Sequence, residues 1–138
     1  MRITLCYSMQ FADKAEDVRL TLGYLGHTAF TTKCNHKYLG LSDQEKEKLK
    51  LEEKYNHDAI REHGGLIKES DAILVINYDK HGIAGYIGGN VFLEMGLAHF
   101  LDKKIYLLNP IPKMPYYETE IIAMRPVVIG GDLEKILA

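Results

Sequence analysis

Residues 72–108 read AILVINYDKHGIAGYIGGNVFLEMGLAHFLDKKIYLL, and the order of their apolar runs indicates a strand, a helix and a second strand. Ala72 to Ile76 is an almost uninterrupted apolar run, which is typical of a strand that is covered on both faces. A loop from Asn77 to Gly89 leads into an apolar helix from Val91 to Leu101, and Ile105 to Leu108 is another buried strand. This unit predicts two parallel strands that are joined by a crossover helix.

The alternation of strands and helices continues on both sides of this unit. We expect further strands at Ile3 to Tyr7, His27 to Thr32 and Val127 to Ile129, and helices at Ala12 to Leu25, Ser42 to Tyr55, Ala59 to Glu69, Glu118 to Met124 and Asp132 to Leu137. The pattern predicts an α/β fold, a three-layer flavodoxin-like (Rossmann-like) sandwich with a five-stranded parallel sheet in the order 2-1-3-4-5. We expect residues 1–138 to form a single domain, because the chain shows no linker or internal repeat.

Composition excludes several classes of protein. The net charge of -2 argues against electrostatic binding to nucleic acid, which needs a basic excess. Charged residues interrupt every apolar stretch before it reaches the length of a membrane span, and the first residues lack the features of a signal peptide. Cys6 and Cys34 are too few for a disulfide framework, so we expect reduced thiols. We therefore expect a cytoplasmic protein with neither a nucleic acid nor a membrane as partner.

Glu94 is the one acid in the apolar helix, and it follows a glycine-rich turn. Gly85, Gly88 and Gly89 permit positive φ angles and let a ligand approach the main chain closely. Asn90 is a suitable N-cap, which would bring Glu94 near the first turn, where the helix dipole favours an ionised carboxylate. The helix is apolar nearly all round, so we expect it to be buried, and a buried acid is costly unless it is paired or used. A functional acid and a Glu that only bonds nearby amides both fit this pattern.

Four short segments resemble the nucleoside 2-deoxyribosyltransferase superfamily, which includes deoxyribosyltransferases and nucleotide N-glycosidases. These segments are Asp71-Ala72-Ile73-Leu74-Val75, Gly88-Gly89-Asn90, Glu94-Met95-Gly96-Leu97-Ala98 and Lys104-Ile105, and the resemblance is clearest over residues 70–109. It implies an enzyme that cleaves or transfers the N-glycosidic bond of a (deoxy)nucleoside or nucleoside monophosphate without a cofactor. Glu94 would attack C1′, the base would leave, and a second base or water would then take the sugar.

The same resemblance implies an assembly and exposes three departures. Related enzymes complete their sites across subunits, so we expect a homodimer or a higher homo-oligomer, with Tyr116-Tyr117 as interface candidates. The family commonly has an Asp six positions before the nucleophile, where this chain has Gly88, and an acid about where this chain has His63. Its nucleotide hydrolases have a phosphate loop after the first strand, which here reads Ser8-Met9-Gln10-Phe11. These departures keep open a non-catalytic module that binds or senses nucleotides.

Several other residues are candidates for the site at the carboxyl edge of the sheet. Asp79 either orients the sugar and protonates the base or simply forms a turn. His63 is a possible general acid or an ordinary helix residue. The expected binding shell consists of Ser8, Met9, Gly88, Gly89 and Asn90, with Tyr86 and Phe11 either stacking on a base or packing in the core.

Two further patterns in the sequence fit roles outside this site. Cys34-Asn35-His36 invites a metal interpretation, but no second ligand pair has suitable spacing, so we expect no metal. Ser42-Asp43-Gln44-Glu45 matches a capping box, and the charged helix that follows is a solvated face, a lid or an oligomer contact. A flavin-binding protein is a weaker alternative, because the loop after the first strand lacks a Ser/Thr-rich phosphate cradle and the chain has no Trp.

Overall fold

The computed structural model describes residues 1–137 and contains a five-stranded sheet in which every strand pair is parallel. The strands are β1 (Arg2–Cys6), β2 (Thr28–Phe30), β3 (Ala72–Val75), β4 (Lys104–Leu107) and β5 (Val127–Val128). Their order is β2-β1-β3-β4-β5, which confirms the predicted flavodoxin-like topology. In the register of the sheet, Ile3 of β1 pairs with Ala29 of β2 on one side and with Ala72 of β3 on the other.

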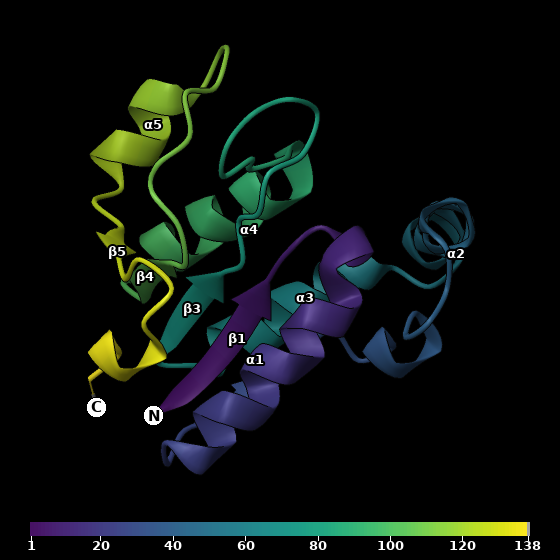
Figure 1. Cartoon of the computed structure of the whole chain (residues 1–138), viewed down its shortest axis with the longest axis horizontal. Helices are drawn as coiled ribbons and strands as arrows, with labels where there is room; N and C mark the ends of the chain where they lie inside the picture. Colours follow the sequence, from purple (N-terminus) through teal and green to yellow (C-terminus); the bar gives the residue numbers. More distant parts are fainter. Residues whose placement is uncertain (138) are drawn as a thin grey trace.

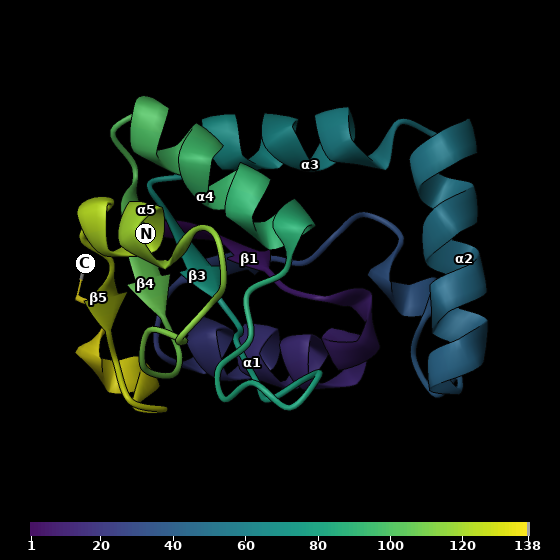
Figure 2. The ribbon, with the colours of Figure 1, turned by 90° about the horizontal axis from the view of Figure 1, so that it is seen from above.

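Helices cover both faces of the sheet and make three layers (Figure 1). The α-helices are α1 (Ala12–Tyr24), α2 (Asp43–Asn56), α3 (Ala59–Lys68), α4 (Gly89–Phe100) and α5 (Glu118–Ala123), and the 3-10 helices are η1 (Met9–Phe11), η2 (Asn35–Lys37) and η3 (Leu133–Lys135). Figure 2 shows α1 on one face of the sheet and α3 and α4 together on the other. α2 belongs to neither layer and crosses one end of the molecule.

Alternate residues of the strands build two separate hydrophobic cores. Ile3 and Leu5 of β1 point toward α1, whereas Cys6 packs with Ile73 and Met95 on the side of α3 and α4. All five side chains are fully buried, as the uninterrupted apolar runs predict for a sheet covered on both faces. β1 lies in the interior of the sheet, so its last residue, Cys6, lies at the carboxyl edge of the sheet, beneath α3 and α4.

α2 begins with the predicted capping box. The Ser42 hydroxyl accepts from the Glu45 amide at 3.2 Å, and the Glu45 carboxylate accepts from the Ser42 amide at 3.0 Å. Lys46 is buried and pairs with Asp13 of α1 at 2.6 Å, which ties α2 to the body of the molecule. One face of this charged helix is therefore packed against the protein, so α2 is not simply a solvated face.

Two predicted boundaries are wrong. The expected C-terminal helix from Asp132 to Leu137 is a single 3-10 turn over Leu133–Lys135, because the segment offers one short turn after Gly130-Gly131 and too few residues to propagate a helix. Asn90 is not the N-cap of α4: Gly88 is, with no side-chain cap bond, and the Gly88 carbonyl already accepts from the Phe92 amide at 2.9 Å.

The prediction that α4 is buried all round is also wrong. Val91, Met95 and Ala98 pack against the sheet, but Leu93 is 61% exposed and Phe100 is 89% exposed. Only one stripe of the helix can contact β3 and β4, so apolar residues on the other face remain at the surface. No helix within residues 1–137 has both the length and the apolar character that crossing a membrane requires.

Candidate active site

Two asparagines organise the carboxyl edge of the sheet between β3 and β4. Asn77 follows β3, and its side-chain amide donates to the Asn109 carbonyl at 3.0 Å and to the Gly85 carbonyl at 3.3 Å. Its side-chain oxygen accepts from the Asn109 amide at 2.9 Å. These bonds fasten the loop that precedes α4 to the loop that follows β4, so the start of α4 has a fixed position beside the edge.

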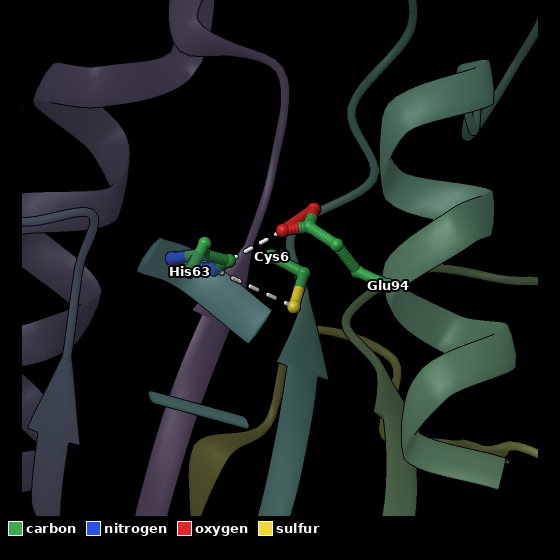
Figure 3. Close-up of side chains that lie close together, drawn as sticks. All are labelled: Cys6, His63 and Glu94. Carbon is green, nitrogen blue, oxygen red and sulfur yellow. Dashed lines mark hydrogen bonds and ion pairs between the residues drawn. The ribbon is translucent and has the colours of Figure 1, made fainter. Parts of the chain in front are cut away.

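Glu94 lies in the second turn of α4 and points toward His63 of α3 and Cys6 of β1 (Figure 3). Its Oε2 atom is 3.2 Å from Nε2 of His63, and the two side chains are only 12% and 7% exposed. The same Nε2 atom is 3.0 Å from the Leu5 carbonyl and 3.9 Å from Sγ of Cys6. Three elements that are distant in the sequence therefore meet at one buried carboxyl group.

Burial shifts the two titratable groups of this contact in opposite directions. It raises the pKa of Glu94 to about 8, against the opposing charge of Lys54. It lowers the pKa of His63 to about 4, although the bond to the Leu5 carbonyl favours the protonated ring. The prediction of an ionised Glu94 is therefore wrong at neutral pH, because the second turn lies beyond the strongest effect of the helix dipole and desolvation outweighs it.

The pair is joined by the hydrogen of Nε2. A carbonyl oxygen can only accept, so the 3.0 Å bond to Leu5 requires a hydrogen on Nε2 of His63. The same N–H faces Oε2 of Glu94 at 3.2 Å, so the neutral ring donates to Glu94 and cannot take up its proton at this nitrogen. Nδ1 of His63 is buried and has no hydrogen-bond partner within residues 1–137, so the ring makes its polar contacts through Nε2.

Glu94 and His63 line a pocket beneath α2. Its other lining residues come from the segment after β1, the β2–α2 connection, α2, the start of α3 and the start of α4, and they include Tyr7, Met9, Thr32, Cys34, Lys50, Glu53, Lys54 and Asn90. The Tyr7 hydroxyl donates to the buried Asn35 side chain at 2.6 Å, which fixes the ring against the pocket. α2 thus supplies one wall of the site, as a lid would.

A second cavity of about 240 Å³ adjoins the first along the start of α4. Tyr7, Met9, Lys50, Lys54 and Asn90 line both spaces. Lys80, Ser8 and the Gly88-Gly89 turn line only the second one. The two spaces are neighbours, with Glu94 in the lining of the first and the N-terminus of α4 in the lining of the second.

The structure brings together most, but not all, of the residues expected at the site. Ser8, Met9, Tyr86, Gly88, Gly89 and Asn90 line one or both of these spaces, and Glu94 lies at the inner end. Asp79 lies elsewhere, since its carboxylate accepts from the Gly85 amide at 2.9 Å and closes the loop. Phe11 also lies outside the lining and packs edge-on against Tyr78, with ring centroids 5.5 Å apart.

Several residues of the site escaped the sequence analysis. Cys6 and Tyr7 read as ordinary strand residues, and Lys80 read as part of a turn. Lys50 and Lys54 are four residues apart, and this spacing places them on one face of α2. It is the only feature of the sequence that links these two lysines. That spacing shows which side chains lie together, but not which side of the helix meets the sheet edge.

Cys6, His63 and Glu94 also form the single group of three metal-ligand side chains found within residues 1–137, with ligand atoms within 4.8 Å of one another. Zinc would need a thiolate and a free imidazole nitrogen. Burial, with a smaller contribution from Glu94, raises the pKa of Cys6 well above its usual range, and Nε2 of His63 faces the Leu5 carbonyl. The arrangement therefore does not fit a zinc site, and Nε2 of His63 is a hydrogen-bond donor.

No family model and no curated protein matches the sequence, but solved structures match the fold. A 2-deoxyribosyltransferase from Bacillus psychrosaccharolyticus superposes with a TM-score of 0.53 at 20% identity, over 80% of this chain and 73% of that one. The CMP N-glycosidase of Clostridium botulinum superposes with a TM-score of 0.50 at 17% identity, over 94% of this chain and 90% of that one.

The chain shares its fold with these two structures. Both carry names that belong to the superfamily whose fold the segments around Gly88 and Glu94 indicated. In this chain, the carboxyl edge of the sheet carries the Glu94–His63 contact. At these identities the likeness establishes the fold alone.

Proposed function

We propose that this protein cleaves or transfers the N-glycosidic bond of a nucleoside or nucleoside monophosphate, with Glu94 as the nucleophile. The observation that carries the proposal is the buried Glu94 carboxyl at the inner end of a pocket, in contact with His63 at 3.2 Å. A desolvated carboxyl with a specific partner at the edge of a parallel sheet is typical of a catalytic group.

The reaction would proceed in two displacements. The Glu94 carboxylate attacks C1′ of the sugar, the C1′–N bond breaks, and its electron pair leaves with the base, which takes up the proton that Glu94 has lost. This step forms a glycosyl ester on Glu94 through an oxocarbenium-like transition state. Water or a second base then attacks C1′, breaks the ester and restores Glu94.

His63 supports this chemistry as a hydrogen-bond donor to Glu94. The carboxyl form predominates at neutral pH, because the pKa of Glu94 is about 8, and a protonated carboxyl is a poor nucleophile. The proton of Glu94 leaves with the base, and Nε2–H of His63, which the Leu5 carbonyl holds at 3.0 Å, stabilises the developing carboxylate across the 3.2 Å contact. His63 lies about where the family commonly has an acid.

The similar structures support this choice of chemistry. One is a 2-deoxyribosyltransferase used for the synthesis of nucleosides, and the other is a CMP N-glycosidase. Both names describe reactions at the bond between a sugar and a base. The geometry around Glu94 is compatible with either transfer or hydrolysis, because the two differ only in the group that attacks the glycosyl ester.

A panel of nucleosides and nucleoside monophosphates, incubated with and without an acceptor base, tests the proposal. Chromatography should detect free or exchanged base with the wild-type protein. Glu94→Ala and Glu94→Gln should lower the rate at least about 1,000-fold, because the nucleophile is gone. His63→Leu, which cannot donate a hydrogen bond to the carboxylate, should lower kcat about 100-fold and leave KM nearly unchanged.

Glu52→Gln, at an exposed position of α2, is the matched control and should keep full activity. Undiminished base release by Glu94→Ala would contradict the nucleophile assignment. Binding of a nucleotide without turnover, in both the wild type and Glu94→Gln, would favour a sensing module. That alternative draws support from Gly88, which replaces the acid commonly found six positions before the nucleophile.

We also propose that the protein assembles into a homodimer or a higher homo-oligomer. Leu93, Leu97 and Phe100 form an exposed apolar stripe on α4, and Ile60 of α3 is exposed near its start. We call these four residues the α4 apolar face. Contiguous apolar surface of this kind is typical of protein–protein contacts.

A further inference from the structure

The cavity beside the α4 N-terminus is lined by positive charge without a balancing acid. Lys50, Lys54 and Lys80 all line it, together with His81, and none of its lining residues is an Asp or Glu. The lysines come from two places that are distant in the sequence, since Lys50 and Lys54 lie on α2 and Lys80 follows β3. Their convergence is a property of the folded chain.

The partners of these lysines leave positive charge uncompensated. Lys50 pairs with Glu47 at 2.7 Å. Within residues 1–137 no ion pair joins Lys54 or Lys80 to a carboxylate, and Nζ of Lys80 instead donates to the Ser8 hydroxyl at 2.8 Å. Of the three ammonium groups, only that of Lys50 is in an ion pair with a carboxylate within residues 1–137.

The positive charges of the lysines repel one another. Partial burial lowers the pKa of Lys54 and of Lys80, and in both cases the nearby charge of Lys50 lowers it further. Glu47 opposes this shift at both lysines, with Glu94 at Lys54 and Asp43 at Lys80, but the pKa of each lysine stays below its ordinary value. Glu53, the other acid of α2 near the pocket, faces Lys37 at 3.6 Å. The repulsion would be relieved by an anionic ligand in the cavity, because an anion offers each ammonium group a charged acceptor.

The start of α4 adds neutral donors to the same cavity. Gly88, Gly89 and Asn90 line it, the helix has no side-chain cap, and no acid occupies its first turn. The first amides of a helix have no partner within the helix, so they can donate to an oxygen-rich anion. Ammonium groups, a serine hydroxyl and free backbone amides are the donors that bind phosphate groups.

We propose that Lys50, Lys54, Lys80 and Ser8 bind the 5′-phosphate of a nucleoside monophosphate, which makes the monophosphate the preferred substrate rather than the free nucleoside. The inference rests on the proposed function for the position of the sugar, whose C1′ lies at Glu94. Gly89 precedes Glu94 by five residues, which is about 7.5 Å along the helix axis. The ribose of a bound monophosphate spans this interval, since Asn90, Met9 and Tyr7 line both spaces.

Isothermal titration calorimetry on Glu94→Gln tests this site separately from catalysis, because that variant binds without turnover. The ligands are the common ribo- and deoxyribonucleoside 5′-monophosphates, the matching nucleosides and inorganic phosphate. The best monophosphate should bind at least about tenfold more tightly than its nucleoside. Added Lys54→Ala or Lys80→Ala should each weaken monophosphate binding about tenfold and leave nucleoside binding unchanged.

Lys48→Ala is the matched control, because Lys48 is exposed on α2 and does not line the cavity. Lys54→Gln and Lys80→Met repeat the test with longer side chains should an alanine variant fold poorly. Equal affinity for a monophosphate and its nucleoside, or an equal loss of both in the lysine variants, would overturn the phosphate site.

The two proposals fail in different ways. Lysine-dependent binding of a monophosphate without base release by the wild type would support the phosphate site and contradict the glycosidic reaction. Base release from nucleosides alone, with no effect of Lys54→Ala or Lys80→Ala, would support the reaction and contradict the phosphate site.

Discussion

Glu94 and His63 depend on each other because they share one small buried space. A carboxylate without a partner in that space would be strongly destabilising, and so would an isolated imidazolium. The fold avoids both by placing the two side chains 3.2 Å apart and by keeping them neutral near pH 7. A charge appears only when Glu94 loses its proton, which the proposed nucleophilic attack requires, and Nε2–H of His63 then faces the carboxylate.

The raised pKa of Glu94 predicts how stability depends on pH. Because the folded-state value is about 8 and the ordinary value is 4.5, Glu94 stabilises the folded state fully below about pH 4.5. This contribution is lost as the pH rises through 8. Relative to Glu94→Gln, the wild type should therefore lose roughly 2–4 kcal/mol in free energy of unfolding between pH 5 and pH 9.

Urea denaturation of both proteins across that pH range measures the difference. The comparison isolates Glu94, because His63 contributes in the opposite direction and does so in both proteins: its contribution is full above about pH 6.5 and is lost as the pH falls through 4. A constant difference between the two proteins from pH 5 to pH 9 would mean that Glu94 is ionised throughout and that its burial costs little.

At the scale of elements, the loop between β3 and α4 determines where Glu94 lies. Gly85 has a φ of 67° inside this loop, and a Cβ atom there would lie 2.9 Å from the Pro110 carbonyl. Asn77 and Asp79 both bond to the Gly85 backbone, so the turn is held from two sides. Only glycine satisfies the conformation and the close approach together.

Gly85→Ala should therefore lower the free energy of unfolding by about 1–3 kcal/mol, through backbone strain and the contact with Pro110. Gly89→Ala is the control within the same loop–helix junction, since its Cβ would meet nothing within 4 Å. That change should be neutral or stabilise the protein by up to about 1 kcal/mol. Thermal or urea unfolding measures both, and equal effects would contradict the role given to Gly85.

The strands of the sheet were predictable because a strand that is buried on both faces has a continuous apolar sequence. The run from Ala72 to Ile76 has no polar residue, and right-handed crossovers then leave few possible strand orders. α2 shows the opposite case. Its capping box predicted where it begins, but a helix with few apolar residues gives no sign of the face that packs, so its place across the site was not predictable.

The site was predictable in part for the same reason. Glu94 stood out as an acid among apolar residues, and the glycines beside it marked a close approach of backbone to ligand. Its protonation was not predictable, because it depends on desolvation by Cys6, His63 and other residues far away in the sequence. The lysines of the cavity converge only through the position of α2, which no local pattern encodes.

At the scale of the whole molecule, the distribution of apolar residues between the core and the surface is uneven. The sheet face under α1 is sealed by Ala12, Ala15, Val18 and Leu22. On the other side, the outward stripe of α4 carries the α4 apolar face instead of the charged residues that usually cover a surface helix. The residues of that face nearest to α3, together with Glu94, line a small pocket, so a second copy placed there would also close off the site from one side.

A second copy of this chain is the expected occupant, because a two-fold contact pairs one apolar stripe with its own equivalent. Sedimentation or light scattering should therefore find a dimer or a larger assembly at micromolar concentration. Leu93→Glu and Phe100→Glu should each shift it toward the monomer, since a charge would be buried without a partner. Tyr24→Glu, at a 91% exposed position on α1, should leave assembly unchanged. A wild-type monomer would contradict this prediction, and an assembly that both α4 variants retain would place the contact on another face.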